Sequence, residues 1–147
     1  MKLLDFIVCD DIRHELGGKL SLMGIFGDTI RLQVPRGSPR PIAFPMAVYL
    51  RVLLEEQDSV PDAFRVVVNL DGKEFAKIEG HIGITGDTPK ILGFVLPLKM
   101  LQVSGNAMMS LVATFLVGGR SRADLSPPYD ISIQIVEVEA KDHPKKG

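Results

Sequence analysis

Residues 45–56, with the sequence PMAVYLRVLLEE, decide the fold. Every second residue of the segment is apolar: Met46, Val48, Leu50, Val52 and Leu54. The positions between them include Tyr49, Arg51 and Glu55. Because side chains alternate between the two faces of a strand, this pattern places the apolar set on one face. The segment therefore predicts a long β-strand that covers a core with one face.

Alternation of the same kind recurs along the chain. It appears in residues 29–34, 106–117 and 130–135. Residues 3–9 and 91–96 are short apolar runs, which are typical of buried strands. No stretch of the sequence combines a 3.6-residue apolar period with capping residues, so we expect little or no helix.

The dipeptide Asp71-Gly72 predicts a hairpin between strands at 63–69 and 73–82. Matching the apolar faces of the two strands favours a three-residue loop, 70–72, with Gly72 in the left-handed region. The expected pairs are Val66 with Ala76, Phe64 with Ile78, Arg65 with Lys77 and Val67 with Phe75. The last pair lies on the outer face, and its apolar character indicates that a loop or another subunit covers that face.

A second hairpin is expected at Gly17-Gly18. Its returning strand, residues 19–26, would point Leu20, Leu22 and Phe26 toward the core. Gly24 in that strand indicates a bulge or the close approach of another group.

About eight to nine strands follow from these patterns, because prolines cluster in the segments between the expected strands. Strands at this spacing predict an all-β fold, an antiparallel two-sheet β-sandwich, with a closed barrel as the alternative. Residues 1–139 would form one domain. Residues 140–147, AKDHPKKG, are polar and predict a flexible tail.

Composition narrows the class of protein. Of the 147 residues, 46% are hydrophobic and 24% are charged, which is typical of globular proteins and excludes disorder and collagen. The formal net charge of −1 gives no excess of positive charge for general nucleic-acid binding. The single cysteine, Cys9, forms no intramolecular disulfide. No stretch has the length of a membrane span, and Asp5 interrupts the N-terminal apolar run, so we expect a cytoplasmic protein without a signal peptide.

The residue types of common active sites are sparse in this sequence. Cys9 with His14 or His81 would make a nucleophile–base pair, but a cysteine in an apolar strand is usually buried and inert. The densest polar cluster contains Asp10, Asp11, Arg13 and Glu15. We interpret it as an Asp/Glu–Arg network that fixes the first hairpin, and the alternative is a metal-dependent enzyme using Asp10, Asp11, His14 and Glu15. We expect no cofactor and no metal.

Two segments expected to be loops carry paired arginines, Arg36 with Arg40 and Arg120 with Arg122. Arginines of two neighbouring loops bind anions in bidentate geometry. These four residues are the candidate site for a small anionic ligand, provided that the two loops converge.

The N-terminal segment resembles a bacterial domain family of unknown function. The resemblance rests on residues 5–15, DFIVCDDIRHE, followed by residues 18–26, GKLSLMGIF, which match an opening pattern C-D-D-I-R-x-E…G-K…L-x-G. It implies a bacterial origin and carries no activity. The pattern from Leu96 to Phe115, with Gly105 before a strand, also resembles immunoglobulin-like and C2-like sandwiches.

Three functions are therefore weighed. The favoured one is a non-catalytic β-sandwich that binds a protein partner or self-associates as a homo-oligomer, because apolar residues lie on outward faces. The alternatives are the arginine-based anion-binding module and the metal-dependent enzyme. Neither nucleic acid nor membrane is an expected partner.

Overall fold

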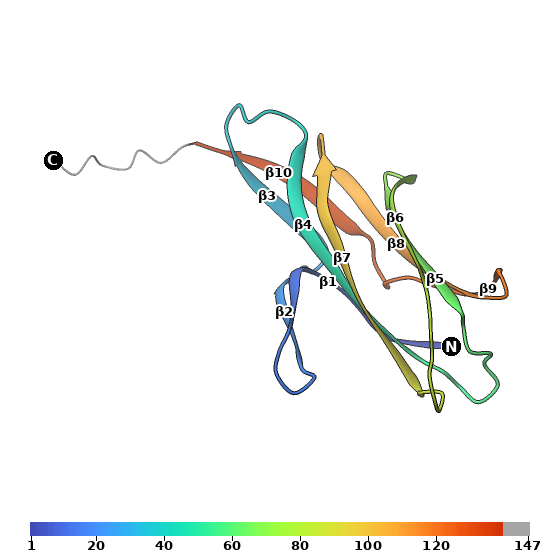
Figure 1. Cartoon of the computed structure of the whole chain (residues 1–147). Helices are drawn as coiled ribbons and strands as arrows, with labels where there is room; N and C mark the ends of the chain where they lie inside the picture. Colours follow the sequence, from blue (N-terminus) through green and yellow to red (C-terminus); the bar gives the residue numbers. More distant parts are fainter. Residues whose placement is uncertain (140–147) are drawn as a thin grey trace.

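A computed structural model describes residues 1–139, apart from the side chain of Lys99. The expected tail, 140–147, lies outside the described residues. The described part of the chain contains ten strands (Figure 1): β1 (Lys2–His14), β2 (Leu20–Ile25), β3 (Thr29–Pro35), β4 (Ile42–Leu53), β5 (Ala63–Leu70), β6 (Lys73–His81), β7 (Ile91–Val103), β8 (Ala107–Val117), β9 (Arg120–Leu125) and β10 (Ile131–Val138). The described residues contain no helix, and hence none that is long and apolar enough to cross a membrane.

The strands form two sheets. One has the order β2-β1-β4-β7, and the other has the order β3-β10-β8-β5-β6 with β9 paired to β8. The all-β sandwich is confirmed, and the sheets do not close into a barrel. One pair, β3 with β10, is parallel, so the expectation of a wholly antiparallel fold was wrong at this edge. These two strands are about a hundred residues apart, and local patterns do not report their relative direction.

The core lies between the two sheets. Val48, Leu50 and Val52 of β4 are fully buried, as the alternation predicted. The opposite sheet contributes Val66, Val68, Ala113 and Phe115. Phe94 links the sheets, with ring centroids 5.0 Å from Phe64 and 5.6 Å from Phe115.

The β5–β6 hairpin differs from the expected register. Leu70 pairs with Lys73, so the connection has two residues, and both take a positive φ, 50° at Asp71 and 79° at Gly72. Positive φ at both positions matches the type I′ turn, whose twist suits a hairpin. The observed pairs are Val66 with Ile78, Val68 with Ala76 and Val67 with Lys77. A bulge between Val68 and Asn69 leaves Phe75 without an opposite residue and restores the apolar faces.

Two segments outside the expected strands also form strands. Residues 97–103 belong to β7, where Pro97 is accommodated because β7 is an edge strand. Residues 120–125 form β9. Gly118 and Gly119 have φ of 59° and 78°, which closes a tight hairpin and brings Arg120 opposite Val117. Arg120 and Arg122 therefore lie on a strand.

Candidate interaction site on the first hairpin

Strand β1 has two partners along its length. It pairs with β4 from Lys2 to Cys9, and with β2 from Cys9 to His14. Beyond Cys9 the chain therefore forms a two-stranded hairpin, residues 10–25, which we call the arm. Figure 1 shows this hairpin extending away from β4 and β7 at the lower left.

The arm carries apolar side chains that the core does not use. Leu16 at its tip is 96% exposed, Ile25 is 62% exposed and Met23 is 43% exposed. Ile12, Leu20 and Leu22 are half-buried. Within residues 1–139, none of these six side chains packs against the core.

The prediction that Leu20 and Leu22 point into the core was therefore wrong. The pairing between β1 and β4 ends at Cys9, so β4 does not pair with this part of β1. Phe26, the third residue of that expectation, does pack against the core. Its N–H donates to the carbonyl of Val8 at 2.9 Å, and this bond marks the base of the arm.

The register gives the arm two different faces. Ile12 pairs with Leu22 and His14 pairs with Leu20, so these four residues share the first face. Asp11 pairs with Met23 and Arg13 pairs with Ser21 on the second face. The first face is mainly apolar, and the second is mixed.

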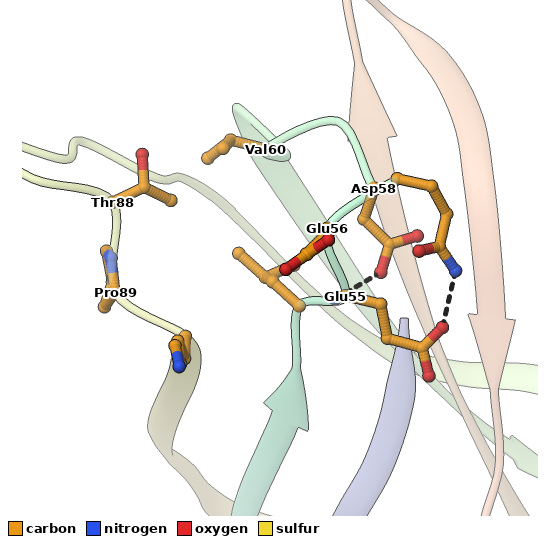
Figure 2. Close-up of a pocket in the computed structure, with 9 residues that line it drawn as sticks. Glu55, Glu56, Asp58, Val60, Thr88 and Pro89 are labelled. Atoms are coloured by element: carbon orange, nitrogen blue, oxygen red, sulfur yellow. Dashed lines mark hydrogen bonds between the residues drawn. The ribbon is translucent and has the colours of Figure 1, made fainter.

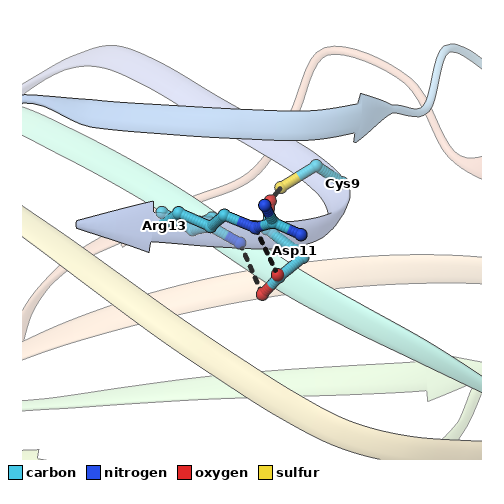
Figure 3. Close-up of polar contacts among 4 residues, drawn as sticks. Cys9, Asp11 and Arg13 are labelled. Carbon is cyan, nitrogen blue, oxygen red and sulfur yellow. Dashed lines mark hydrogen bonds and ion pairs between the residues drawn. The ribbon is translucent and has the colours of Figure 1, made fainter. Parts of the chain in front are cut away.

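The polar cluster lies wholly on the arm, and Figure 3 shows two of its members, Asp11 and Arg13. Asp11 accepts a hydrogen bond from the N–H of Ile12 at 2.9 Å, and its second oxygen lies 3.5 Å from Nε of Arg13. Both side chains of this ion pair are more than half exposed. Asp10 lies over Gly24, and Glu15 donates its backbone N–H to the carbonyl of Lys19 at 2.8 Å. The structure thus shows one ion pair, between Asp11 and Arg13, among these four residues.

The cluster does not converge on a metal-sized space. Among residues 1–139, no group of three His, Cys, Asp or Glu side chains is placed to hold a metal ion. The alternation of the strand separates the candidates, because Asp10 and His14 lie on one face of β1 while Asp11 lies on the other.

Cys9 is fully buried at the base of the arm. Its Sγ lies 3.5 Å from the carbonyl oxygen of Asp11 (Figure 3). It also lies 3.7 Å from the carbonyl oxygen of Ala47. Burial raises the pKa of the Cys9 thiol, and the nearby carboxylates of Asp10 and Asp11 act in the same direction. A raised pKa disfavours the thiolate that a nucleophile requires.

The structure separates the two arginine pairs. Arg36 lies 3.6 Å from Glu139 and Arg40 lies 3.3 Å from Glu137, both beside the end of β10. Arg120 pairs with the last residue of β8, whereas β10 meets β8 at its first residue, Ala107. The eleven residues of β8 lie between the two pairs, a length on the order of 30 Å. The four arginines therefore do not form one clamp, and anion binding by either pair alone stays a prediction.

The structure also contains an acidic groove that was not predicted from the sequence (Figure 2). It has a volume of about 600 Å³ and lies between Glu55, Glu56 and Asp58 on one side and Thr88 and Pro89 on the other. The Met1 amine forms an ion pair with Asp58 at 2.7 Å, and Asp58 also accepts the N–H of Glu55 at 2.8 Å.

These two partners lower the pKa of Asp58, with the hydrogen bond from the N-terminal amine as the largest cause. The Met1 side chain is only 3% exposed and packs against the core. Asp58 therefore holds the N-terminus in place. No sequence signal connects Met1 with Asp58, because they meet only through the fold.

The sequence of this chain matches a known protein family. A model of a family of unknown function, DUF6941, matches residues 4–118 and so includes the whole arm. No curated protein matches the chain.

Proposed function

The chain belongs to this family of unknown function, and from that premise we propose that it is a non-catalytic β-sandwich that binds a macromolecular partner or a second copy of itself through the arm. The observation that carries the proposal is the set of apolar side chains on the arm that do not pack against the core. Apolar side chains gathered outside the core are typical of protein–protein contacts.

The stability of the arm supports the same proposal. A hairpin of two strands is only marginally stable in water by itself, and a third strand or another packed layer is normally needed. The arm has two strands, and Ile12, Leu20 and Leu22 on its first face lie outside the core. A partner that covers this face would supply the missing layer.

The alternative of a small anionic ligand has weaker support. Arg36 and Arg40 already face Glu139 and Glu137, which compensate their charge. Arg120 and Arg122 lie on β9 at the other end of β8.

The setting of the protein is also part of the proposal. A reducing, cytoplasmic compartment fits a chain whose single cysteine is buried. The resemblance of residues 5–26 supports a bacterial origin, and an immunoglobulin-like relationship rests only on the pattern from Leu96 to Phe115.

The test replaces Ile12 and Leu22, the apolar pair on the first face of the arm. A double variant, Ile12→Ser with Leu22→Ser, is compared with a matched double variant, Met100→Ser with Met108→Ser, which removes exposed apolar side chains outside the arm. Native mass spectrometry reads the size of the assembly in an extract of the source cells, and urea denaturation reads the stability of each purified variant.

We expect the arm variant to release the chain from its assembly and to change the free energy of unfolding by less than about 1 kcal/mol, since neither residue contacts the core. The matched variant should keep the assembly. An arm variant that remains in an assembly of unchanged size, or a wild-type chain that is monomeric in the extract, would contradict the proposal.

A further inference from the structure

A smaller cavity adjoins the acidic groove, at the place where the N-terminus meets β9. It has a volume of about 170 Å³ and is lined by Met1, Gln57, Asp58, Ser59 and Arg122. Figure 1 shows the N-terminus and β9 at the same end of the fold. The side chain of Met1 packs against the core, so the end of this residue that borders the cavity is the one that carries the amine.

We propose that this cavity binds a single phosphate-sized oxyanion between the guanidinium of Arg122 and the amine of Met1. The proposal goes beyond the proposed function, because the cavity contains no residue of the arm. It uses Arg122 alone and does not depend on the other three arginines of the expected anion site.

Strand β9 is irregular at Arg122. Ser121 and Ala123 pair with consecutive residues of β8, so Arg122 between them has no opposite residue. A bulge of this kind bends the strand and re-aims a side chain, and bulges are common beside active sites. Here the side chain of the extra residue borders the cavity.

Asp62 fixes the two walls of the cavity relative to each other. Its Oδ2 accepts the N–H of Gly118 at 2.9 Å, and its own N–H donates to the carbonyl of Leu116 at 2.9 Å. Gly118 and Leu116 belong to the β8–β9 hairpin, which carries Arg122, and Asp62 lies shortly after residues 57–59. The walls are therefore held in place without a ligand, which lowers the entropic cost of binding one.

The charges in the cavity leave one positive charge uncompensated. The amine of Met1 pairs with Asp58 at 2.7 Å. None of the ion pairs within residues 1–139 involves Arg122. An ammonium and a guanidinium together carry several N–H donors, whereas a single carboxylate, that of Asp58, lines the cavity. An anion that enters would accept hydrogen bonds from both cations, in bidentate geometry at Arg122.

The volume of the cavity limits the size of the anion. A water molecule occupies about 30 Å³ of the liquid, so a cavity of about 170 Å³ holds roughly five non-hydrogen atoms, the size of a phosphate group. A nucleotide needs several times this space. The donors also come from three separate segments, since the hydroxyl of Ser59 joins the N-terminus and β9. Donors in three directions suit a tetrahedral anion better than a planar carboxylate.

Neighbouring carboxylates limit the affinity. Glu55 and Glu56 line the acidic groove rather than this cavity, but they are close to Asp58 in the chain. At physiological ionic strength charges act over about 8 Å, so these two groups oppose the entry of an anion. We therefore expect weak binding, with a dissociation constant on the order of 1 mM.

Titration with inorganic phosphate tests the site. Amide chemical shifts are followed by NMR at constant ionic strength, with chloride as the balancing salt. They should change saturably in residues 57–59 and 120–122 and stay constant in the arm. Arg122→Gln should weaken binding about tenfold, the loss expected for a hydrogen bond between charged groups. Arg120→Gln is the matched control, because Arg120 lies on the same hairpin opposite Val117 and does not line the cavity.

Two further changes test the other donors. Ser59→Ala removes the hydroxyl and should weaken phosphate binding about two- to five-fold. Acetylation of the Met1 amine removes the second positive charge and should also weaken it. Urea denaturation without phosphate checks that each altered protein is folded before its affinity is compared.

Two other anions identify the ligand. Glycerol phosphate presents the same phosphate group as an ester, so saturable binding of either compound is the expected result, and the tighter of the two shows whether the source is an ester or the free ion. Acetate that binds as tightly as phosphate would overturn the assignment of a tetrahedral anion.

The site itself would be overturned by either of two results. One is the absence of saturable shifts in residues 57–59 and 120–122 up to about 20 mM phosphate, far above the expected dissociation constant. The other is an equal loss of affinity in Arg120→Gln and Arg122→Gln. Neither result bears on the proposed function, because the arm takes no part in this cavity.

Discussion

The carboxylate of Asp10 lies over Gly24, in the space that a Cβ at residue 24 would occupy. An ideal Cβ there would lie 2.8 Å from Cγ of Asp10, which is closer than real Cβ contacts. Gly24 also has a φ of 63°, in the left-handed region. The close approach of Asp10 and the left-handed backbone of Gly24 therefore restrict the conformation at the base of the arm.

Substitution of Gly24 should loosen the arm selectively. Gly24→Ala adds backbone strain on the order of 1–2 kcal/mol and displaces the Asp10 side chain. Amide hydrogen exchange across residues 10–25 should accelerate roughly tenfold, while the core strands keep their protection. Gly105→Ala is the control, because Gly105 has no positive φ and no atom lies near its Cβ position. Equal exchange rates in the arm of both variants would contradict the prediction.

Core and arm should respond differently to truncation. Phe115 is fully buried, so Phe115→Ala should lower the free energy of unfolding by about 3–5 kcal/mol. Ile25 is 62% exposed, so Ile25→Ala should change it by no more than about 0.5 kcal/mol. Urea denaturation in dilute solution measures the free energy of unfolding of each variant. Comparable losses from the two variants would mean that the arm is part of the core.

The ion pair at the N-terminus predicts a pH-dependent contribution to stability. Because the folded state lowers the pKa of Asp58 below its ordinary value of 3.8, the contribution is present above that value. It is lost as the pH falls through the folded pKa, because the carboxyl then becomes protonated in both states.

The comparison of wild type with Asp58→Asn tests this sign. The wild type should be the more stable protein near neutral pH, and the difference should disappear in thermal unfolding curves below the pKa of the folded state. Acetylation of the N-terminus should reduce stability in the same pH range, because it removes the positive charge. Glu56→Gln serves as a control from the same groove. A stability difference that persists at low pH would contradict the prediction.

Cys9 should be unreactive until the protein unfolds. Its side chain is fully buried and its pKa is raised by burial, so both access and thiolate formation are disfavoured. A chromogenic disulfide reagent should label the native protein only as fast as it unfolds, and label it at once in denaturant. The Leu16→Cys variant provides an exposed thiol at the arm tip for comparison. Native labelling of Cys9 at the rate of that thiol would contradict the prediction.

Sequence patterns predicted the elements that depend on local periodicity. The alternation in residues 45–56 predicted β4, and Met46, Val48, Leu50 and Val52 are buried as expected. Gly24 predicted a close approach, which the structure finds at Asp10. These features follow from side-chain period and glycine geometry, which act within a few residues.

The pairing between strands was harder to predict from the sequence than the strands themselves. The β5–β6 hairpin takes the type I′ turn that Asp71-Gly72 favours, and the bulge at Phe75 then corrects the faces. One loop length was expected to set both the turn and the apolar faces, whereas the protein satisfies the two requirements separately. The placement of Arg120 and Arg122 on β9 was missed because this short strand has few apolar residues.

Alternation alone predicted that this chain forms strands with one apolar face, because it is a local property of neighbouring residues. Which strands meet, and where each pairing ends, depends on the packing of the whole chain. Strand β1 has the same partner, β4, as far as Cys9, and from there its apolar residues continue without the core beside them. That end point depends on the register between β1 and β4, which are some forty residues apart in the sequence. Because the pairing ends there, the first hairpin lies outside the core and is the candidate interaction site.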